Sequence, residues 1–290
     1  MTTDNGNISI LDRIVAAKRK RIAEDRNATS LATMIRAAEE ASPPLRFDHA
    51  LCPSVDSRLC GNDGGIRGGI GGTVSVIAEM KRSSPSAGVM DLTLDPAQRA
   101  QTYCRAGSAA ISVLTEQDFF RGSLTDLERA ADVAHGHGVA VLEKDFVVDE
   151  YQIYQARASG ADTVLLIIAI LDPVQYSDLY DVATGIGMEP LVEVFDAAEL
   201  DVALTSAEPR IVGVNNRNLK TLTTSLDVFP ALAKRIPDDV VKVAESGMRS
   251  ADDVKRMADA GANAVLVGES LMTADGDPSE LISQMATITV

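Results

Sequence analysis

Residues 76–88 read VIAEMKRSSPSAG and mark the start of the regular part of the chain. The apolar run at 74–78 is typical of a buried strand, which must end before Pro85 because proline cannot donate to a β-ladder. Glu79 and Lys81 lie two residues apart, so on an extended strand their side chains point to the same face. Such a carboxylate and ammonium can form an acid/base pair or, equally, an ion pair at a solvated strand end.

Short runs rich in Val, Ile and Leu recur along the chain from residue 74 onward. They lie at 74–78, 109–114, 139–142, 163–168, 190–194, 211–214, 240–244 and 264–267. Helix-like segments separate most of them, at 95–106, 124–135, 150–159, 173–184, 197–206 and 251–260. About eight alternations of strand and helix over roughly 215 residues predict a closed (β/α)8 TIM barrel of the α/β class. An open doubly wound sheet is the alternative, but no G-x-G-x-x-G motif opens a first helix.

Two helices are predicted before the first strand, at 8–25 and 31–40, and we treat residues 1–45 as an N-terminal helical extension. The basic cluster at 18–21, Lys-Arg-Lys-Arg, lies around the polar side of the first helix, and we expect it to be a solvated face. Apart from this extension, one barrel domain accounts for the chain.

A glycine-rich segment at 54–73 interrupts the chain before the first strand. It includes GNDGGIRGGIGG without the Lys-Ser/Thr ending of a P-loop, which predicts a flexible insertion and not a nucleotide site. We expect that deletion of residues 63–71 leaves activity largely intact. After the eighth helix no room remains for a second barrel, which predicts a monofunctional protein.

Charge and cysteine content limit the partners and the compartment. With 42 acidic against 27 basic residues, the formal net charge is −15, so a broad nucleic-acid surface is excluded and any anionic ligand must be bound locally. Three cysteines, Cys52, Cys60 and Cys104, without a secretory pattern favour reduced thiols and a cytoplasmic protein. No stretch is apolar enough for a signal peptide or for a membrane span.

Polar residues follow six of the predicted strands, and the carboxyl ends of barrel strands converge on one face. In chain order they are Glu79, Lys81 and Ser84; Glu143, Lys144 and Asp145; Glu193; Asn215, Asn216 and Arg217; Glu245, Ser246 and Gly247; and Gly268, Glu269 and Ser270. The last two groups favour a phosphate site made of backbone N–H groups freed by glycine, although ordinary turns would look alike.

Glu193 is flanked by apolar residues, and a buried carboxylate requires a partner. Lys144 and Lys81 can supply that charge from other strands of the barrel, either for proton transfer or as a structural salt bridge. His135 and His137 fall at the opposite rim, where we expect them to face solvent and not to bind a metal.

The strand ends carry, in this order, the motifs IAEMKRSSPSAG, ISVLTEQDFFRGS, LEKDFVVDEYQI, ADTVLLI, MEPLVEV, VGVNNRNL, KVAESGM and VLVGESLM. Together they closely resemble the indole-3-glycerol phosphate synthase family, over about residues 8–272. The resemblance implies a (β/α)8 barrel with N-terminal helices near the active-site mouth. It also implies a phosphorylated small-molecule substrate, 1-(2-carboxyphenylamino)-1-deoxyribulose 5-phosphate, and no cofactor or metal. The glycine-rich insertion is not usual for the family.

The resemblance further implies the roles of the site residues. Lys144 would be the general acid that protonates the ketone oxygen, Glu193 would stabilise the cationic intermediate and transfer a proton, and Lys81 with Glu79 would assist dehydration. Asn215 and Ser246 would orient the substrate, and Ser84 would lie near the carboxylate that leaves. The phosphate would be bound by Arg217, Ser246, Gly247, Gly268 and the backbone of Glu269, and the apolar wall around the ring would comprise Phe120, Phe146, Leu165, Leu219 and Leu266.

Two other functions remain open at this point. One is a Schiff-base aldolase that uses Lys144 as its nucleophile, and the other is a catalytically silent barrel that binds a phosphorylated metabolite. A monomer is expected, with a homodimer as the alternative.

Overall fold

The computed structural model of the chain describes residues 9–52, 72–273 and 277–290. Its centre is a closed barrel of parallel strands, in which each strand pairs with its neighbours in chain order and β1 pairs with both β4 and β10. The barrel strands are β1 (Ser75–Met80), β4 (Ala110–Leu114), β5 (Ala140–Lys144), β6 (Thr163–Ile167), β7 (Leu191–Val194), β8 (Ile211–Asn215), β9 (Val241–Glu245) and β10 (Ala264–Val267). The predicted (β/α)8 barrel is therefore confirmed.

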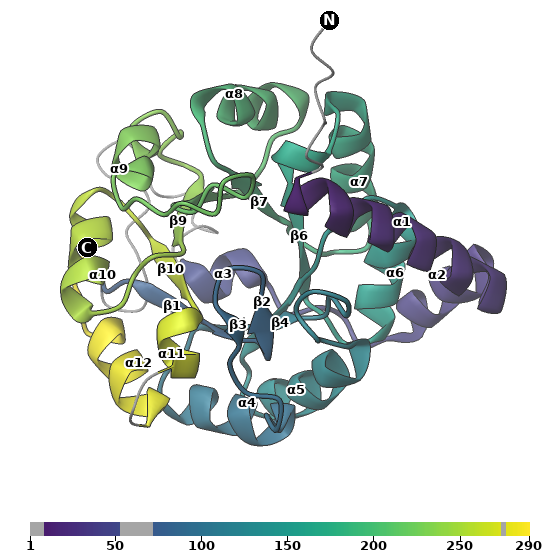
Figure 1. The fold of residues 1–290 in the computed structure, drawn as a ribbon, viewed down its shortest axis with the longest axis horizontal. Coiled ribbons are helices and arrows are strands. Elements are labelled where there is room, and N and C mark those ends of the chain that lie inside the picture. Colours follow the sequence, from purple (N-terminus) through teal and green to yellow (C-terminus); the bar gives the residue numbers. More distant parts are fainter. Residues whose placement is uncertain (1–8, 53–71, 274–276) are drawn as a thin grey trace, which may run out of the picture.

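Helices form a ring around the strands (Figure 1). They are α4 (Pro96–Arg105), α5 (Leu124–Gly136), α6 (Glu150–Ala158), α7 (Pro173–Gly185), α8 (Ala197–Ser206), α9 (Val228–Ala233), α10 (Ala251–Asp259), α11 (Glu269–Thr273) and α12 (Pro278–Ala286), with a 3₁₀ turn at Ile168–Ile170. Side-chain caps fix several of the starts. Ser250 and Asp253 form a capping box on α10, and Asp172 accepts from the first amides of α7.

Alternation along each strand divides the core into two layers. On β5, Ala140 and Leu142 belong to the cluster inside the barrel, whereas Val141 belongs to the cluster between strands and helices. The same period of two continues to the strand end, so Lys144 points inward and Glu143 points outward. Every barrel strand follows this rule, which brings the inward residues of the carboxyl ends together.

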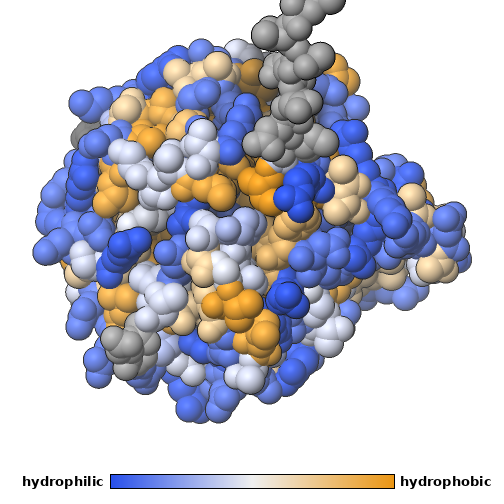
Figure 2. Space-filling model, in the orientation of Figure 1, coloured by the Kyte–Doolittle hydropathy of each residue, from blue (hydrophilic) through white to orange (hydrophobic). Residues whose placement is uncertain are grey.

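The N-terminal helices lie at both ends of the barrel. In the view of Figure 1, α1 (Ile10–Ala28) crosses the near side, α2 (Leu31–Glu40) packs against α6, and α3 (Phe47–Leu51) lies behind the strands. Phe47 and Leu51 of α3 are fully buried in the interior cluster, so α3 closes the amino end of the barrel. Around the mouth at the opposite end, hydrophobic surface gathers towards the centre while the periphery is mostly hydrophilic (Figure 2).

One expectation about α1 is wrong. Arg19 and Lys20 of the basic cluster are exposed, but Lys18 is only 6% exposed and donates to the Asp145 carboxylate at 2.8 Å. Helical spacing places Lys18 on the buried stripe of Leu11 and Ile14, so its long apolar stem packs inward while its ammonium reaches a buried carboxylate.

Several elements were not predicted. They are helix α3 and the small hairpin of β2 (Ser83–Ser84) with β3 (Gly88–Val89). Helices after the sixth and eighth strands were expected from the alternation but received no bounds, and the structure places α9, α11 and α12 there. Helices α3, α9 and α11 span only five or six residues, too few to show a helical period. The insertion at 54–73 falls outside the described residues except for Gly72 and Thr73, and the assignment of residues 1–290 to one domain stays a prediction.

Candidate active site

A pocket of about 450 Å³ opens at the carboxyl ends of the strands. Its volume is within the range of small-molecule sites, and its position is the one at which barrel enzymes place their chemistry. Inward residues near the ends of three strands line it: Glu79 in β1, Lys144 at the end of β5, and Glu193 in β7. Glu245, at the end of β9, does not line the pocket itself but contacts Lys144. All three carboxylates are at least 97% buried, so each requires a partner.

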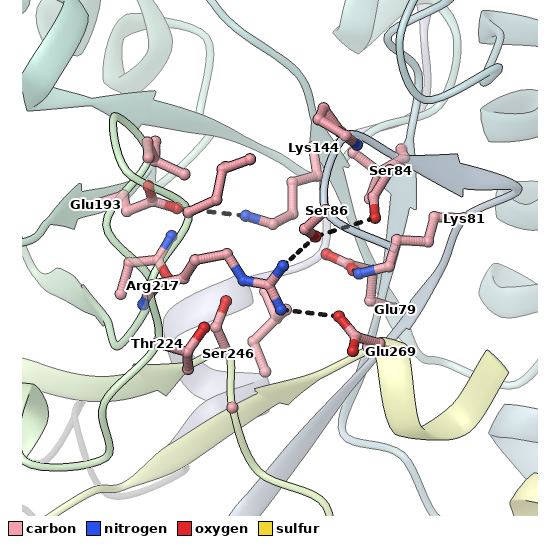
Figure 3. A pocket seen from close by; sticks show the side chains of 18 of the residues that line it. Glu79, Lys81, Ser84, Ser86, Lys144, Glu193, Arg217, Thr224, Ser246 and Glu269 are labelled. Atoms are coloured by element: carbon pink, nitrogen blue, oxygen red, sulfur yellow. Dashed lines mark hydrogen bonds and ion pairs between the residues drawn. The ribbon is translucent and has the colours of Figure 1, made fainter. Parts of the chain in front are cut away.

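The Lys144 ammonium is that partner for two of them. Its Nζ lies 3.3 Å from Glu193 Oε2 and 3.2 Å from Glu245 Oε2 (Figure 3 shows the pair with Glu193). Burial opposes the charge on Lys144, but the carboxylates of Glu245, Glu193 and Glu79 outweigh it and raise the pKa of Lys144 above its ordinary value. Lys144 therefore remains protonated in the resting pocket.

The Glu245 carboxyl group also has a raised pKa, which in its case favours the neutral form. Burial raises the pKa of its carboxyl to about 8, with the Glu193 charge adding to the effect and Lys144 opposing it. One ammonium cannot fully compensate two buried carboxylates, so Glu245 holds a proton near neutral pH. Lys144, Glu193 and Glu245 thus form a cluster in which Lys144 can donate a proton and Glu245 can replace it.

Glu79 and Lys81 form a second pair on the same side of the pocket. Lys81 Nζ lies 2.7 Å from Glu79 Oε1, as their spacing on one strand face predicts, and both side chains are largely buried. The pair is therefore not a solvated strand end. Glu79 is seated over Gly268, where any Cβ would overlap its carboxylate.

At another side of the pocket, the Arg217 side chain contacts polar groups from two other segments, the loop after β1 and helix α11. Its guanidinium donates to Glu269 Oε2 at 2.8 Å and to the hydroxyl of Ser86 (Figure 3). Although partial burial opposes ionisation, the Arg217 guanidinium lowers the pKa of Glu269. The turn after β9 is tight, with φ of 65° at Ser246 and 86° at Gly247, and a Cβ on Gly247 would lie 2.8 Å from Thr224 Cγ2. Ser246 and Gly247 both line the pocket.

The remaining wall of the pocket is apolar. The rings of Phe120 and Phe146 lie 6.0 Å apart between centroids, and Leu165, Leu219 and Leu266 continue the surface. Helix α1 adds Ile10, Leu11 and Ile14 from above the barrel mouth. The pocket therefore offers a charged interior, an arginine with tight glycine turns, and an apolar wall.

This arrangement can be compared with known proteins. The family model described as indole-3-glycerol phosphate synthase matches residues 11–284. A protein of that name from Nocardioides sp. is 46% identical over 281 residues, covering 97% of this chain and 99% of the relative. Another, from Albidiferax ferrireducens, is 44% identical and covers 95% of this chain and 97% of the relative. The chain belongs to the indole-3-glycerol phosphate synthase family.

Solved structures support the fold of this family member more distantly. Superposition with 3-hexulose-6-phosphate synthase from Salmonella typhimurium gives a TM-score of 0.58 at 14% identity and covers 74% of this chain and 98% of that one. Thiamine phosphate pyrophosphorylase from Pyrococcus furiosus gives 0.56 at 13% identity, with 74% and 94% covered. At such low identity these likenesses establish the barrel fold alone.

The site residues expected from the indole-3-glycerol phosphate synthase resemblance all line this one pocket. They are Glu79, Lys81, Ser84, Phe120, Lys144, Phe146, Leu165, Glu193, Asn215, Arg217, Leu219, Ser246, Gly247, Leu266, Gly268 and Glu269. Glu193 pairs with Lys144, whereas Lys81, the other lysine considered for it, pairs with Glu79. The roles of these residues in the synthase reaction stay predictions.

Glu245 was named from the sequence among the converging strand-end residues but was given no role in the site, and Ser86 was not named. Glu245 ends an apolar run, and Glu193 lies within one. A carboxylate next to apolar strand residues is the signal that could have identified Glu245. Of the two histidines placed at the opposite rim, both are exposed; His135 contacts the Asp162 carboxylate and His137 contacts Gln101. Within residues 9–52, 72–273 and 277–290, no group of three or more His, Cys, Asp or Glu side chains is arranged to hold a metal ion. None of the helices in these ranges is long and apolar enough to cross a membrane.

Proposed function

We propose that this pocket carries out the ring closure of 1-(2-carboxyphenylamino)-1-deoxyribulose 5-phosphate to indole-3-glycerol phosphate, a step of tryptophan biosynthesis. The observation that carries the proposal is the Lys144 ammonium, held between Glu193 and Glu245 in the interior of the pocket. The arginine and the glycine turns suit the phosphate of the substrate, and the apolar wall suits its aromatic ring.

In the first step, the ring carbon that bears the carboxylate attacks the ketone carbon and forms the new carbon–carbon bond. Lys144 donates its proton to the ketone oxygen, which becomes a hydroxyl group. The ring then carries positive charge, which the Glu193 carboxylate stabilises in a site with little water. Loss of carbon dioxide returns the electron pair of the broken bond to the ring and restores aromaticity.

In the second step, the hydroxyl group leaves as water. Lys81 supplies the proton to the departing oxygen, and Glu79, 2.7 Å from that ammonium, accepts the proton that the neighbouring carbon loses. Each turnover thus releases one carbon dioxide and one water. A proton on Glu245, whose pKa is raised to about 8, can restore the charge on Lys144.

The ends of the substrate are bound by the remaining residues. Arg217, Ser246 and the backbone at Gly247, Gly268 and Glu269 bind the phosphate, and Ser84 and Asn215 lie near the carboxylate that leaves. All seven residues line the pocket, at the ends of β8, β9 and β10 or in the loop after β1, and this supports the placement. The proposal also places the protein in the cytoplasm as a monomer, with a homodimer as the alternative.

The purified protein tests the proposal when it is supplied with the carboxyphenylamino-deoxyribulose phosphate and no added cofactor. We expect carbon dioxide and the indole product in equal amounts. A Schiff-base aldolase would instead form a borohydride-reducible adduct at Lys144, detectable by mass spectrometry, and would release no carbon dioxide. A protein that binds the substrate without consuming it would support the silent-barrel alternative.

A further inference from the structure

Lys18 lies in the first helix, yet its ammonium reaches the strand that carries Lys144. Four residues of α1 are buried, Leu11, Ile14, Lys18 and Ile22, and their spacing forms one stripe along the helix. Leu11 and Ile14 contact the pocket. Lys18 is therefore a charged residue in a position where the helix pattern calls for an apolar one.

Both carboxylate oxygens of Asp145, the partner of Lys18, accept hydrogen bonds. Asp145 Oδ2 lies 2.8 Å from Lys18 Nζ and 2.9 Å from the Thr115 hydroxyl, and Asp145 Oδ1 accepts the backbone N–H of Phe146 at 2.7 Å. The ammonium also faces the buried carboxyl groups of Glu143 and Glu116. Both members of the ion pair are about 94% buried on their side chains, so neither position is adjustable without loss of a charge partner.

Stability does not account for this pair. A buried ion pair yields little net free energy of folding, because removing both charges from water opposes their attraction, and an apolar residue in the stripe would pack at least as well. What such a pair provides is a fixed geometry, since each charge tolerates only the arrangement in which it meets the other. Here the fixed geometry joins α1 to the end of β5.

The end of β5 is where the chemistry lies. Asp145 follows Lys144 directly, and both residues line the pocket. The Asp145 carboxylate meets Lys18 of α1, whereas the Lys144 ammonium meets Glu193 and Glu245. The ion pair with Lys18 holds the Asp145 carboxylate and therefore fixes the backbone from which Lys144 extends. The same carboxylate fixes the Phe146 amide on the other side. We propose that Lys18 is a positioning residue, whose ion pair with Asp145 holds the Lys144 ammonium between Glu193 and Glu245. This inference rests on the proposed function, in which Lys144 is the proton donor.

The proposal is tested by comparing Lys18→Met with Lys20→Met, a matched change on the same helix at a side chain that is 81% exposed. We expect Lys18→Met to lower kcat by about 10-fold or more, because small misplacements of a reacting group have effects of this order, with little change in KM. Lys20→Met should behave as the wild type. Wild-type kcat in folded Lys18→Met, or a change confined to KM, would overturn the proposal.

Asp145→Asn provides the second variant, which breaks the same pair if Lys18→Met does not fold. We expect it to lower kcat in the same way, and the double variant to lose no more than the worse single variant, because both act through one contact. If the double variant instead lost kcat by the product of the two single losses, the two residues would not act through one contact.

Hydrogen exchange tests the link between α1 and β5 independently of the proposed reaction. Deuterium uptake in α1 and at the Phe146 amide should rise in Lys18→Met and not in Lys20→Met. Unchanged uptake would refute the link between α1 and β5 even if the wild type is active, whereas a wild type that forms no indole would refute the reaction and leave the exchange result standing.

Discussion

Glu245 lies against Gly213 on the neighbouring strand. A Cβ built on Gly213 would overlap Glu245 Oε1, so the buried carboxylate occupies space that only glycine leaves open. The other carboxylate oxygen of Glu245 is 3.2 Å from Lys144 Nζ. A residue without a side chain thus sets the position of a carboxylate that contacts the proposed proton donor.

Gly213→Ala should therefore impair the reaction through Glu245. The added methyl must displace the carboxylate and with it the Lys144 ammonium, and we expect kcat to fall by about 10²-fold, as for other misplaced groups. Steady-state kinetics on protein with an unchanged circular dichroism spectrum measure this. Gly136→Ala is the matched control, because its new Cβ meets nothing within 4 Å. Full activity in Gly213→Ala would show that the position of Glu245 does not matter.

Glu143 gives a prediction about pH and stability. Burial, together with the nearby Asp145 carboxylate, raises the pKa of Glu143 to about 8 from 4.5. Between these values the folded protein holds a proton that the unfolded chain has lost. The stability due to this group is therefore fully present below about pH 4.5 and is lost as the pH rises to about 8, by about 1.4 kcal/mol per pH unit for one proton.

Glu143→Gln should remove this dependence, because the amide does not titrate and its carbonyl oxygen can accept the hydrogen bond that the Thr115 hydroxyl donates to Glu143. Thermal unfolding at pH 5 and pH 8 measures this. The stability of the variant relative to the wild type should be greater at pH 8 than at pH 5. Glu24→Gln, an exposed change, serves as the control. A difference that stays constant with pH would mean that Glu143 is ionised throughout.

Arg217 should govern the affinity for the phosphate. Replacing it with Met removes a charge-assisted contact, and we expect KM to rise about 10-fold to 100-fold with a smaller effect on kcat. Inhibition by inorganic phosphate should weaken in parallel. Arg235→Met, at a surface pair with Asp201, is the control. If phosphate inhibition is unaltered in Arg217→Met, the phosphate binds elsewhere.

The barrel and most of the pocket could be predicted from the sequence because both follow from local patterns. Repeated apolar runs identify strands, and polar residues directly after them must converge once the barrel closes. Glu79 and Lys81 are an extreme case, since their pairing depends only on a spacing of two along one strand.

The contacts that were missed depend on the closed structure. Glu245 lies 101 residues from Lys144 in the chain and meets it only across the barrel interior. Lys18 was assigned to the polar face because a hydrophobic pattern counts lysine as polar, whereas a buried carboxylate 127 residues away draws it inward. Helix α3 spans five residues, too few to show a period.

Lys144 carries the central claim, and the most direct test measures formation of the indole ring by fluorescence with the wild type and with Lys144→Met. The account predicts a strong signal from the wild type and a loss of about 10²-fold to 10⁴-fold in the folded variant, the range expected for a general acid. No signal from a folded wild type that binds the substrate, or near wild-type turnover by folded Lys144→Met, would contradict it.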